Sequence, residues 1–232
     1  MKKNNNFSIS IILPFLNEIN SLKKTIKILE KIRFKKEYIV IFSEKLINKS
    51  NKQELIRLKK IYKNLNYFNQ LKPFVGGAID LGIKKSKLKY IVIMASDLET
   101  NPKELSRMIK ISLKNPNAII SADRWISRRG FSDYGIIKFF ANFLFQKLIK
   151  FFFKYEILDF TFAYRIYPKK ALKMKTINEL RHGFALELLL RPIKQGYKVL
   201  TVPATWTKRV EGSSSITIKS YFSYLKVLYK NI

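Results

Sequence analysis

Cysteine is absent from this chain of 232 residues. Disulfide bonds and thiolate metal sites are therefore excluded, and the composition fits a reducing compartment such as the cytosol. Long apolar runs are also missing, because nowhere do about 18 uncharged apolar residues follow one another, so we expect no membrane-spanning helix. Residues 1–6 are polar and lack the apolar segment of a signal peptide, so we expect a disordered tail and no secretion.

Linker-like stretches rich in proline, glycine and serine are absent, and the whole chain has only 7 prolines and 8 glycines. No shift in composition divides the chain either. Because a chain of this length can bury one sizeable core, we expect a single domain.

Acidic residues are scarce, since 16 aspartates and glutamates face 46 lysines and arginines, which gives a formal net charge of +30. Such a charge predicts attraction to polyanions such as nucleic acid, anionic lipid or phosphorylated substrates. An AT-rich genome would also produce this abundance of Lys, Ile, Asn and Phe without any selected partner, and both explanations stay open. Signatures of zinc fingers, RNA-recognition motifs and basic zippers are lacking, so we expect no nucleic-acid partner.

What the first half does contain is an alternation of strand-like and helix-like segments. This alternation predicts an α/β fold with a Rossmann-like, mainly parallel central sheet and helices on both faces. The expected strands are 7–13, 38–42, 65–71, 90–95 and 118–121, and the expected helices are 19–33, 53–62, 78–87 and 102–113. The second half loses the alternation, so we expect an appended layer there.

Two segments of the second half combine aromatic residues with lysines and contain no acidic residue, namely 135–153 and the C-terminal stretch 218–232. Each predicts an amphipathic helix. Such a helix could lie in a membrane interface, with its cations at the headgroups and its aromatic rings inserted, or it could pack in the core. For 135–153 both interpretations stay open, and for 218–232 we favour contact with an anionic membrane surface.

The most informative stretch is an apolar run over 90–95 that ends in Asp97 and Glu99. A strand buried on both faces belongs to a parallel sheet, and such sheets bind ligands just beyond the carboxyl ends of their strands. Asn101 can cap a helix that starts at Pro102, with Glu104 placed to complete a capping box. Mg²⁺ or Mn²⁺ takes oxygen ligands, so Asp97 is our first choice of metal ligand and Glu99 a second ligand or a sugar-hydroxyl acceptor. The alternative is a pair of solvated loop carboxylates at a helix start.

A second polar group follows the first expected strand, where Pro14, Asn17 and Glu18 stand. An amide and a carboxylate at this place could hydrogen-bond a nucleobase or a ribose. Helix capping by Asn17 is the alternative.

Together these segments resemble the family 2 glycosyltransferases of the GT-A fold, and the resemblance runs from about residue 7 to residue 217. The order of the matching segments carries it. They are Pro14-x-x-Asn17-Glu18, the small-residue segment 75–82, Ser96-Asp97-Leu98-Glu99, Ser121-Ala122-Asp123-Arg124-Trp125, the segment 158–165, the helix around Glu187, Val202-Pro203, and the loop from Arg209 to Ser215.

Within that superfamily the chain looks most like the branch of dolichyl- and polyprenyl-phosphate sugar synthases. Several positions depart from the pattern of the family. Ala95 replaces the first aspartate of its Asp-Ala-Asp motif, and Glu99 stands where that branch often has glutamine. Glu44 alone remains of an acidic pair after the second strand, and Asp80 replaces an arginine.

The resemblance implies roles for the matching residues. Contacts to the nucleotide-sugar are expected from Pro14, Asn17, Glu18, Glu44, Gly76, Asp97, Arg124 and Arg209, and metal ligation from Asp97 and Glu99. Catalytic roles are expected for Asp159, Glu187 and Arg165. For the arginines a structural salt bridge is the alternative, and for Asp159 a turn cap. His182, the only histidine, is expected to be a loop or capping residue.

From this we expect an inverting, metal-dependent glycosyltransferase that moves a sugar from a nucleotide-diphosphate donor to a polyprenyl-phosphate or other envelope-glycan acceptor. A nucleotidyltransferase, or a degenerate GT-A domain that only binds, are the alternatives. Residues 7–217 are the expected catalytic domain, divided into a nucleotide-sugar half (7–121) and an acceptor half (122–217). The expected location is the cytoplasm, peripherally at the inner face of the plasma membrane.

Overall fold

The computed structural model of the protein describes residues 7–132, 134–153, 155, 157, 159–173, 176–212 and 218–231. The tail expected at residues 1–6 and the serines of the expected 209–215 loop lie outside these ranges. Among the described residues, no helix combines the length and the apolar character needed to cross a membrane.

A central sheet of seven strands in the order β3-β2-β1-β4-β6-β5-β7 organises the described part of the chain. All neighbouring strands run parallel except β6, which is antiparallel to β4 and to β5. The strands are β1 (Ser8–Pro14), β2 (Lys35–Phe42), β3 (Leu65–Asn69), β4 (Tyr90–Ile93), β5 (Ile119–Asp123), β6 (Arg165–Pro168) and β7 (Val199–Pro203). The expected α/β fold with a mainly parallel sheet is therefore confirmed.

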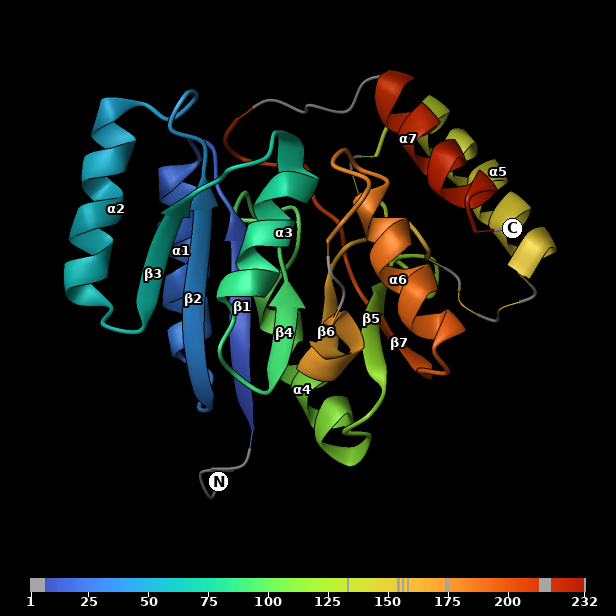
Figure 1. Cartoon of the computed structure of the whole chain (residues 1–232), viewed down its shortest axis with the longest axis horizontal. Helices are drawn as coiled ribbons and strands as arrows, with labels where there is room; N and C mark the ends of the chain where they lie inside the picture. The colour runs from blue at the N-terminus through green and yellow to red at the C-terminus, as the bar shows by residue number, and fades with distance from the viewer. Residues whose placement is uncertain are drawn as a thin grey trace.

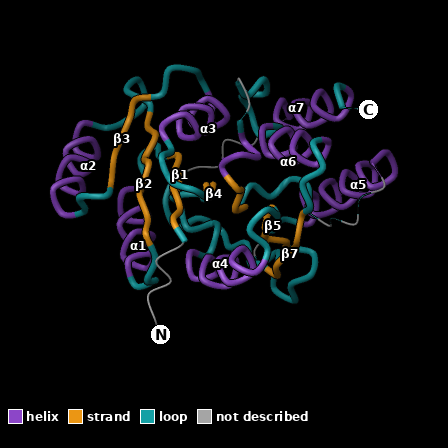
Figure 2. Tube along the Cα trace, turned by 60° about the horizontal axis from the view of Figure 1, so that its bottom comes forward, coloured by secondary structure: helices purple, strands orange, loops and turns teal. Residues whose placement is uncertain are grey.

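The helices cover both faces of this sheet. They are α1 (Ile19–Glu30), α2 (Lys49–Ile61), α3 (Phe74–Lys85), α4 (Leu105–Lys114), α5 (Ile136–Phe153), α6 (Phe184–Lys194) and α7 (Ile218–Tyr229). Apolar residues of α1, α2 and α4 join one core cluster and those of α3 and α6 another, on opposite sides of the strands (Figures 1 and 2). A third cluster joins α5, α6 and α7 at the right-hand end of Figure 1.

Strand β1 shows why the sheet is buried on both faces. Ile9, Ile11 and Leu13 alternate along it and face the core of α1, whereas Ile12 points to the opposite core. Side chains of a strand alternate between faces, and helices cover both, so a continuous apolar run is the expected pattern. In Figure 1 the chain enters β1 from the bottom, so the carboxyl ends of the parallel strands lie at the top.

The second half differs from the expected appended layer, because β6 and β7 belong to the same sheet as the first half. The proposed division between 121 and 122 falls inside β5. Strand β6 has only four residues and inserts between β4 and β5, and this pairing of distant segments leaves no periodic signal in the sequence. The additional layer consists of α5 and α7.

Helix α3 begins at Phe74, four residues before the expected start at 78. Gly76 and Gly77 are therefore part of its first turn instead of preceding it. A Cβ atom at Gly76 would lie 2.6 Å from the carbonyl oxygen of Glu179, so only glycine lets the helix approach this backbone. Close packing overrides the low helix propensity of glycine here.

Candidate active site

The two carboxylates after β4 lie on a tight turn at the carboxyl end of the sheet. The Oδ1 atom of Asp97 accepts a hydrogen bond from the backbone N–H of Glu99 at 3.0 Å. Leu98 between them has a φ of 66°, in the left-handed region that side chains with a Cβ rarely adopt. Such strain costs about 1–3 kcal/mol and is concentrated at functional sites. The turn fixes both carboxylates on one short connection.

Arg209 arrives from a distant part of the chain and joins these carboxylates. Its Nε and Nη2 atoms each lie 2.8 Å from Oε1 of Glu99, and Nη2 is 3.3 Å from Oδ2 of Asp97. The hydroxyl of Thr207 donates to the carbonyl oxygen of Leu98 at 3.0 Å, which attaches the same segment to the strained turn. Asp97, Glu99 and Arg209, three residues expected at the donor site, are thus brought together.

The electrostatics of this cluster fit a divalent cation. Burial, followed by the negative charge of Glu99, raises the pKa of Asp97 to about 6, and Glu18 adds to the effect. Two carboxylates crowded in a poorly solvated place are stabilised by an added cation. Among the described residues no group of three or more acidic or histidine side chains could hold a metal ion. A cation here would therefore take two ligands from Asp97 and Glu99 and the rest from phosphate oxygens and water, as Mg²⁺ often does.

Glu18 ties the ends of β1 and β4 together. Its carboxylate accepts the backbone N–H groups of Leu16 at 3.1 Å and of Asn17 at 2.9 Å. Oγ of Ser96 lies 2.6 Å from Oε1 of Glu18 and is also in reach of the carbonyl oxygen of Pro14. These contacts hold the Pro14–Glu18 segment against the acidic turn.

Asn17 does not cap α1, whose N-cap position is Glu18. Its Nδ2 atom donates to the carbonyl oxygen of Leu46 at 3.0 Å, and its Oδ1 atom accepts the backbone N–H of Asn48 at 2.9 Å. Asn17 thus positions the loop after β2. Glu44, on the same loop, is exposed and forms an ion pair of 2.5 Å with Lys52.

A second cluster, which we call the buried pair, consists of Arg124 and Asp159. Nε of Arg124 donates to Oδ2 of Asp159 at 2.6 Å and Nη2 to Oδ1 at 3.0 Å, and both side chains are buried. Burial would raise the pKa of Asp159, but the adjacent Arg124 lowers it below the ordinary value. The guanidinium also lies 4.9 Å from the ring centre of Phe131 and 4.7 Å from that of Phe162. This geometry is that of a structural salt bridge, which was the alternative to a nucleotide-sugar contact for Arg124.

Arg165 lies next to the buried pair and has no exposed surface. Its guanidinium donates to Oγ of Ser121 at 3.0 Å and to the carbonyl oxygens of Ala185, Asp159 and Phe160 at 2.6, 3.1 and 2.9 Å. The side chain therefore joins β6 to β5, to α6 and to the segment that carries Asp159.

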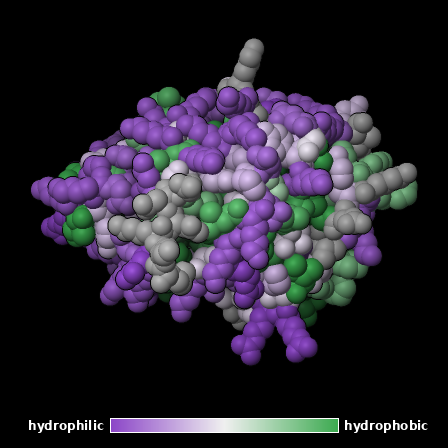
Figure 3. Space-filling view, turned by 90° about the horizontal axis from the view of Figure 1, so that it is seen from below, coloured by the Kyte–Doolittle hydropathy of each residue, from purple (hydrophilic) through white to green (hydrophobic). Residues whose placement is uncertain are grey.

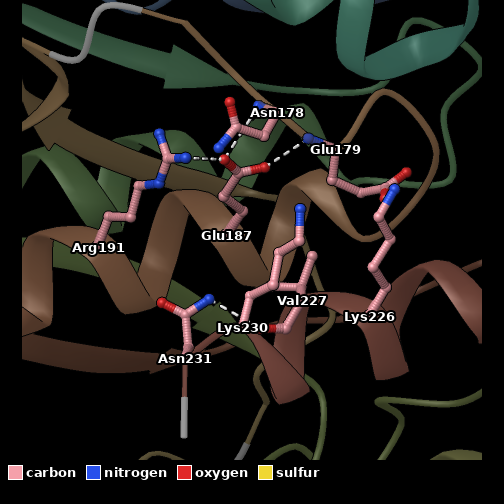
Figure 4. A pocket seen from close by; sticks show the side chains of 8 residues that line it. All are labelled: Asn178, Glu179, Glu187, Arg191, Lys226, Val227, Lys230 and Asn231. Carbon is pink, nitrogen blue, oxygen red and sulfur yellow. Dashed lines mark hydrogen bonds and ion pairs between the residues drawn. The ribbon is translucent and has the colours of Figure 1, made fainter.

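Glu187 lies in a separate polar cavity of about 300 Å³ between α6 and α7 (Figure 4). Its carboxylate accepts the backbone N–H groups of Asn178 at 3.0 Å and Glu179 at 2.7 Å and forms an ion pair of 2.5 Å with Arg191. In Figure 4 these partners surround it from three sides. Glu187 thus holds the loop before α6 in place.

Gly76 joins the start of α3 to that loop, and His182 lies on the loop itself. The N–H of Gly76 donates to the carbonyl oxygen of Leu180 at 2.7 Å. Burial, together with the positive charges of Arg209 and Arg181, lowers the pKa of His182. The positive charge of Arg209 therefore acts on His182, although the two residues are far apart in the sequence.

The capping box expected at the start of the helix after the acidic turn is absent. Asn101 does accept the backbone N–H of Lys103 at 3.1 Å, and Pro102 starts a short 3-10 turn that leads into α4, where a continuous helix was expected. The Oε1 atom of Glu104, however, accepts the N–H of Thr205 at 2.9 Å, a partner beyond β7. The tertiary contact has replaced the local one.

Asp123, at the end of β5, is a buried acid that sequence reasoning did not single out. Oδ1 accepts the N–H of Trp125 at 2.8 Å, whereas Oδ2 is buried and has no hydrogen-bond partner among the residues that the structure describes. Burial and the negative charge of Asp159 raise the pKa of Asp123 to about 6.

This shift predicts a pH dependence of stability that Asp123→Asn reduces. Between about pH 4, the ordinary value of an unfolded aspartate, and about pH 6 the native state binds more protons than the unfolded state. The free energy of unfolding should therefore fall as the pH rises through this window, by about 1–3 kcal/mol for this residue. Urea denaturation of both proteins at several pH values measures the difference. Asp97 contributes in the same direction to both proteins, so identical slopes would contradict the prediction.

A second cavity, of about 420 Å³, lies beside the buried pair at the start of α5. Exposed Arg128 and Arg129 and the aromatic residues Trp125, Phe131 and Phe139 line it. The rings of Trp125 and Phe139 are 5.1 Å apart. Two arginine side chains and three aromatic rings thus line the same cavity.

Comparisons with known proteins give one family and many similar folds. The family model described as glycosyl transferase family 2 matches residues 10–174. Glucosyl-3-phosphoglycerate synthase from Mycobacterium tuberculosis, solved with Mn²⁺, UDP and phosphoglyceric acid, has 14% sequence identity and a TM-score of 0.71 over 97% of this chain and 78% of that one.

Two further solved structures are similar. Residues 1–349 of S. aureus TarS, in complex with UDP-GlcNAc, have 13% identity and a TM-score of 0.64 over 95% of this chain and 65% of that one. The mannosyltransferase PcManGT from Pyrobaculum calidifontis, in complex with GDP-Man and Mn²⁺, has 11% identity and a TM-score of 0.60 over 88% and 58%. At these identities the likeness concerns the fold.

Proposed function

Because the chain belongs to glycosyl transferase family 2, we propose that it transfers a sugar from a nucleotide-diphosphate donor, with inversion and with a divalent cation, to a polyprenyl-phosphate or other envelope-glycan acceptor. The observation that carries the proposal is the cluster of Asp97, Glu99 and Arg209 at the carboxyl end of the sheet. Ligands of parallel sheets bind at this edge.

The donor is proposed to lie between the Pro14–Glu18 segment, the loop that carries Glu44, and the acidic turn. Structures of similar fold hold UDP or GDP-Man with Mn²⁺, which supports a nucleoside diphosphate here. Asp97 and Glu99 would hold Mg²⁺ or Mn²⁺, which supplies positive charge to the departing diphosphate. Arg209 adds a second positive charge beside the same carboxylates, and a guanidinium suits phosphate oxygens.

The acceptor is proposed to be ionised before it reacts. Asp159 and Arg165 have no exposed surface, and Arg124 keeps Asp159 bonded. We therefore assign these residues and Glu187 a structural role on the acceptor side. None of them is proposed to abstract a proton. A phosphate acceptor fits this arrangement because it is already ionised near neutral pH and attacks without a strong general base.

The cavity beside the buried pair is the proposed entrance for that acceptor. Arg128 and Arg129 can meet a phosphate group, and Trp125, Phe131 and Phe139 can meet an apolar chain. A lipid-linked acceptor would place the protein peripherally at the inner face of the plasma membrane. This location is part of the proposal.

A donor screen tests the proposed function. Purified protein is incubated with nucleotide-sugars, with and without Mn²⁺ and phospholipid, and release of the nucleoside diphosphate is followed. We expect turnover of at least one donor only with the cation. Binding is measured independently as a rise in melting temperature with UDP or GDP in the presence of Mn²⁺. No thermal shift and no turnover with any donor would overturn the proposal.

A further inference from the structure

Helix α5 turns two uncharged polar side chains, Asn142 and Gln146, toward the protein, where apolar Ile149 is also buried. Nε2 of Gln146 donates to Oγ1 of Thr161 at 3.1 Å and lies 3.3 Å from Oδ1 of Asp159, while its Oε1 atom accepts the N–H of Phe160 at 2.9 Å. Asn142 donates to the same Thr161 hydroxyl at 3.1 Å. A surface helix normally buries its apolar stripe and exposes its polar one.

The outward side of α5 carries an apolar row that we call the α5 stripe. Its members recur at intervals of three and four residues, which places them on one helical face. They are Ile137, Phe140, Leu144, Leu148 and Phe151, with exposed fractions of 85%, 58%, 66%, 38% and 77%. Contiguous apolar surface of this kind marks a site of interaction with a protein or a membrane.

Helix α7 lies beside α5 and exposes further apolar residues. It packs against α5 through Phe145 and Tyr224, whose ring centres are 5.5 Å apart, and it exposes Phe222, Leu225 and Tyr229. Figures 1 and 2 show the two helices at the same end of the molecule. In Figure 3, green surface likewise gathers toward that end, whereas purple residues cover most of the remaining face.

The charged residues of α5 and α7 are all lysines, of which Lys226 lies 4.0 Å from Oε2 of Glu179. Lys138 and Lys147 are exposed on α5 and Lys226 on α7, and neither helix contains an acidic residue. Exposed Arg128 and Arg129 precede α5. Aliphatic stems of lysine can lie along apolar surface while their ammonium groups reach anionic headgroups.

We propose that the α5 stripe, with the exposed residues of α7, docks in the plane of an anionic lipid bilayer. A second copy of the chain is the competing occupant, but a two-fold interface would bring the lysines of both copies together within a chain of net charge +30. An anionic surface instead complements these lysines. The proposal rests on the geometry of α5 and holds whichever donor or acceptor the enzyme uses.

Vesicle binding of a matched pair of variants tests the proposal. Ile137→Glu with Leu144→Glu alters the stripe, and Ile61→Glu with Leu71→Glu alters two residues of the same types elsewhere. The exposed fractions of the two pairs are similar, at 85% for Ile137 and 66% for Leu144 against 68% for Ile61 and 85% for Leu71. Both variants also change the net charge by the same amount. Vesicles contain phosphatidylcholine alone or with about one third phosphatidylglycerol, and the bound fraction is measured by sedimentation.

We expect the wild type to bind the anionic vesicles and the stripe variant to bind at least about tenfold more weakly, because two apolar anchors are lost. The control variant should stay within about threefold of the wild type. Equal weakening in both variants would mean that net charge alone drives binding and would overturn the docking site. Two results would contradict a bilayer as the occupant of the stripe. One is a wild type that does not bind vesicles, and the other is a wild-type dimer that the control variant still forms and the stripe variant does not. Leu144→Ser against Ile61→Ser repeats the comparison if the glutamates impair folding.

Discussion

Asp97→Asn is expected to lower the rate of sugar transfer by about 10²–10³-fold while the protein remains folded. The variant removes one of two carboxylates proposed to hold the cation. The remaining carboxylate, Glu99, is already neutralised by Arg209, so the variant should bind the cation more weakly. A cation held by these carboxylates would stabilise charge that develops on the departing diphosphate, so its loss should reduce the rate of the chemical step. Release of nucleoside diphosphate at saturating Mn²⁺ measures the effect.

Glu54→Gln is the control for this prediction. Glu54 forms ion pairs with Lys23 and Arg57 on the outer side of α1 and α2, so its neutralisation should leave the rate unchanged. A chelator should abolish turnover in the wild type, and added Mn²⁺ should restore it. The wild type and Asp97→Asn having the same rate would refute the metal assignment.

Asp159→Ala is expected to lower the free energy of unfolding by about 3–5 kcal/mol, because it leaves the buried guanidinium of Arg124 without its counter-charge. Asp159 also accepts the backbone N–H groups of Phe162 at 3.1 Å and Thr161 at 3.3 Å, and these donors would lose their partner too. Urea denaturation measures the change at a pH near neutrality.

A double-mutant cycle separates the pair from its surroundings. Arg124→Ala alone leaves a buried carboxylate unpaired, whereas the double variant removes both charges, so its loss should be smaller than the sum of the two single losses. If Asp159→Ala lost activity with less than about 1 kcal/mol of stability, a direct catalytic role would be favoured over the structural one that its contacts indicate.

The site could be predicted in its parts but not in its connections. The strand over 90–95 and the carboxylates after it follow from local pattern. An apolar run indicates a strand buried in a parallel sheet, and ligands bind just beyond the carboxyl ends of such strands. Arg209 was expected at the donor site, but its bond to Glu99 spans more than a hundred residues and has no local signal. The same holds for Glu104, which reaches Thr205 instead of completing a capping box.

Arg124 and Asp159 illustrate a second limit of prediction from the sequence. The sequence predicts a nucleotide-sugar contact or a salt bridge for Arg124, and a catalytic role or a turn cap for Asp159. The residue types and their order are the same for either role. Burial separates the two, and burial depends on which segments pack around Phe131 and Phe162.

The sequence alone determined the α/β class, the parallel sheet of the first half and the acidic turn, because each depends on periodicity or on neighbours within a few residues. Tertiary structure decided the place of β6 between β4 and β5, the pairing of Arg209 with the acidic turn and which apolar residues of α5 face outward. Asn142 and Gln146 draw the polar side of α5 inward by bonding Thr161 and the segment around Asp159. A helical pattern records which residues share a face, but only the packed chain shows which face points outward.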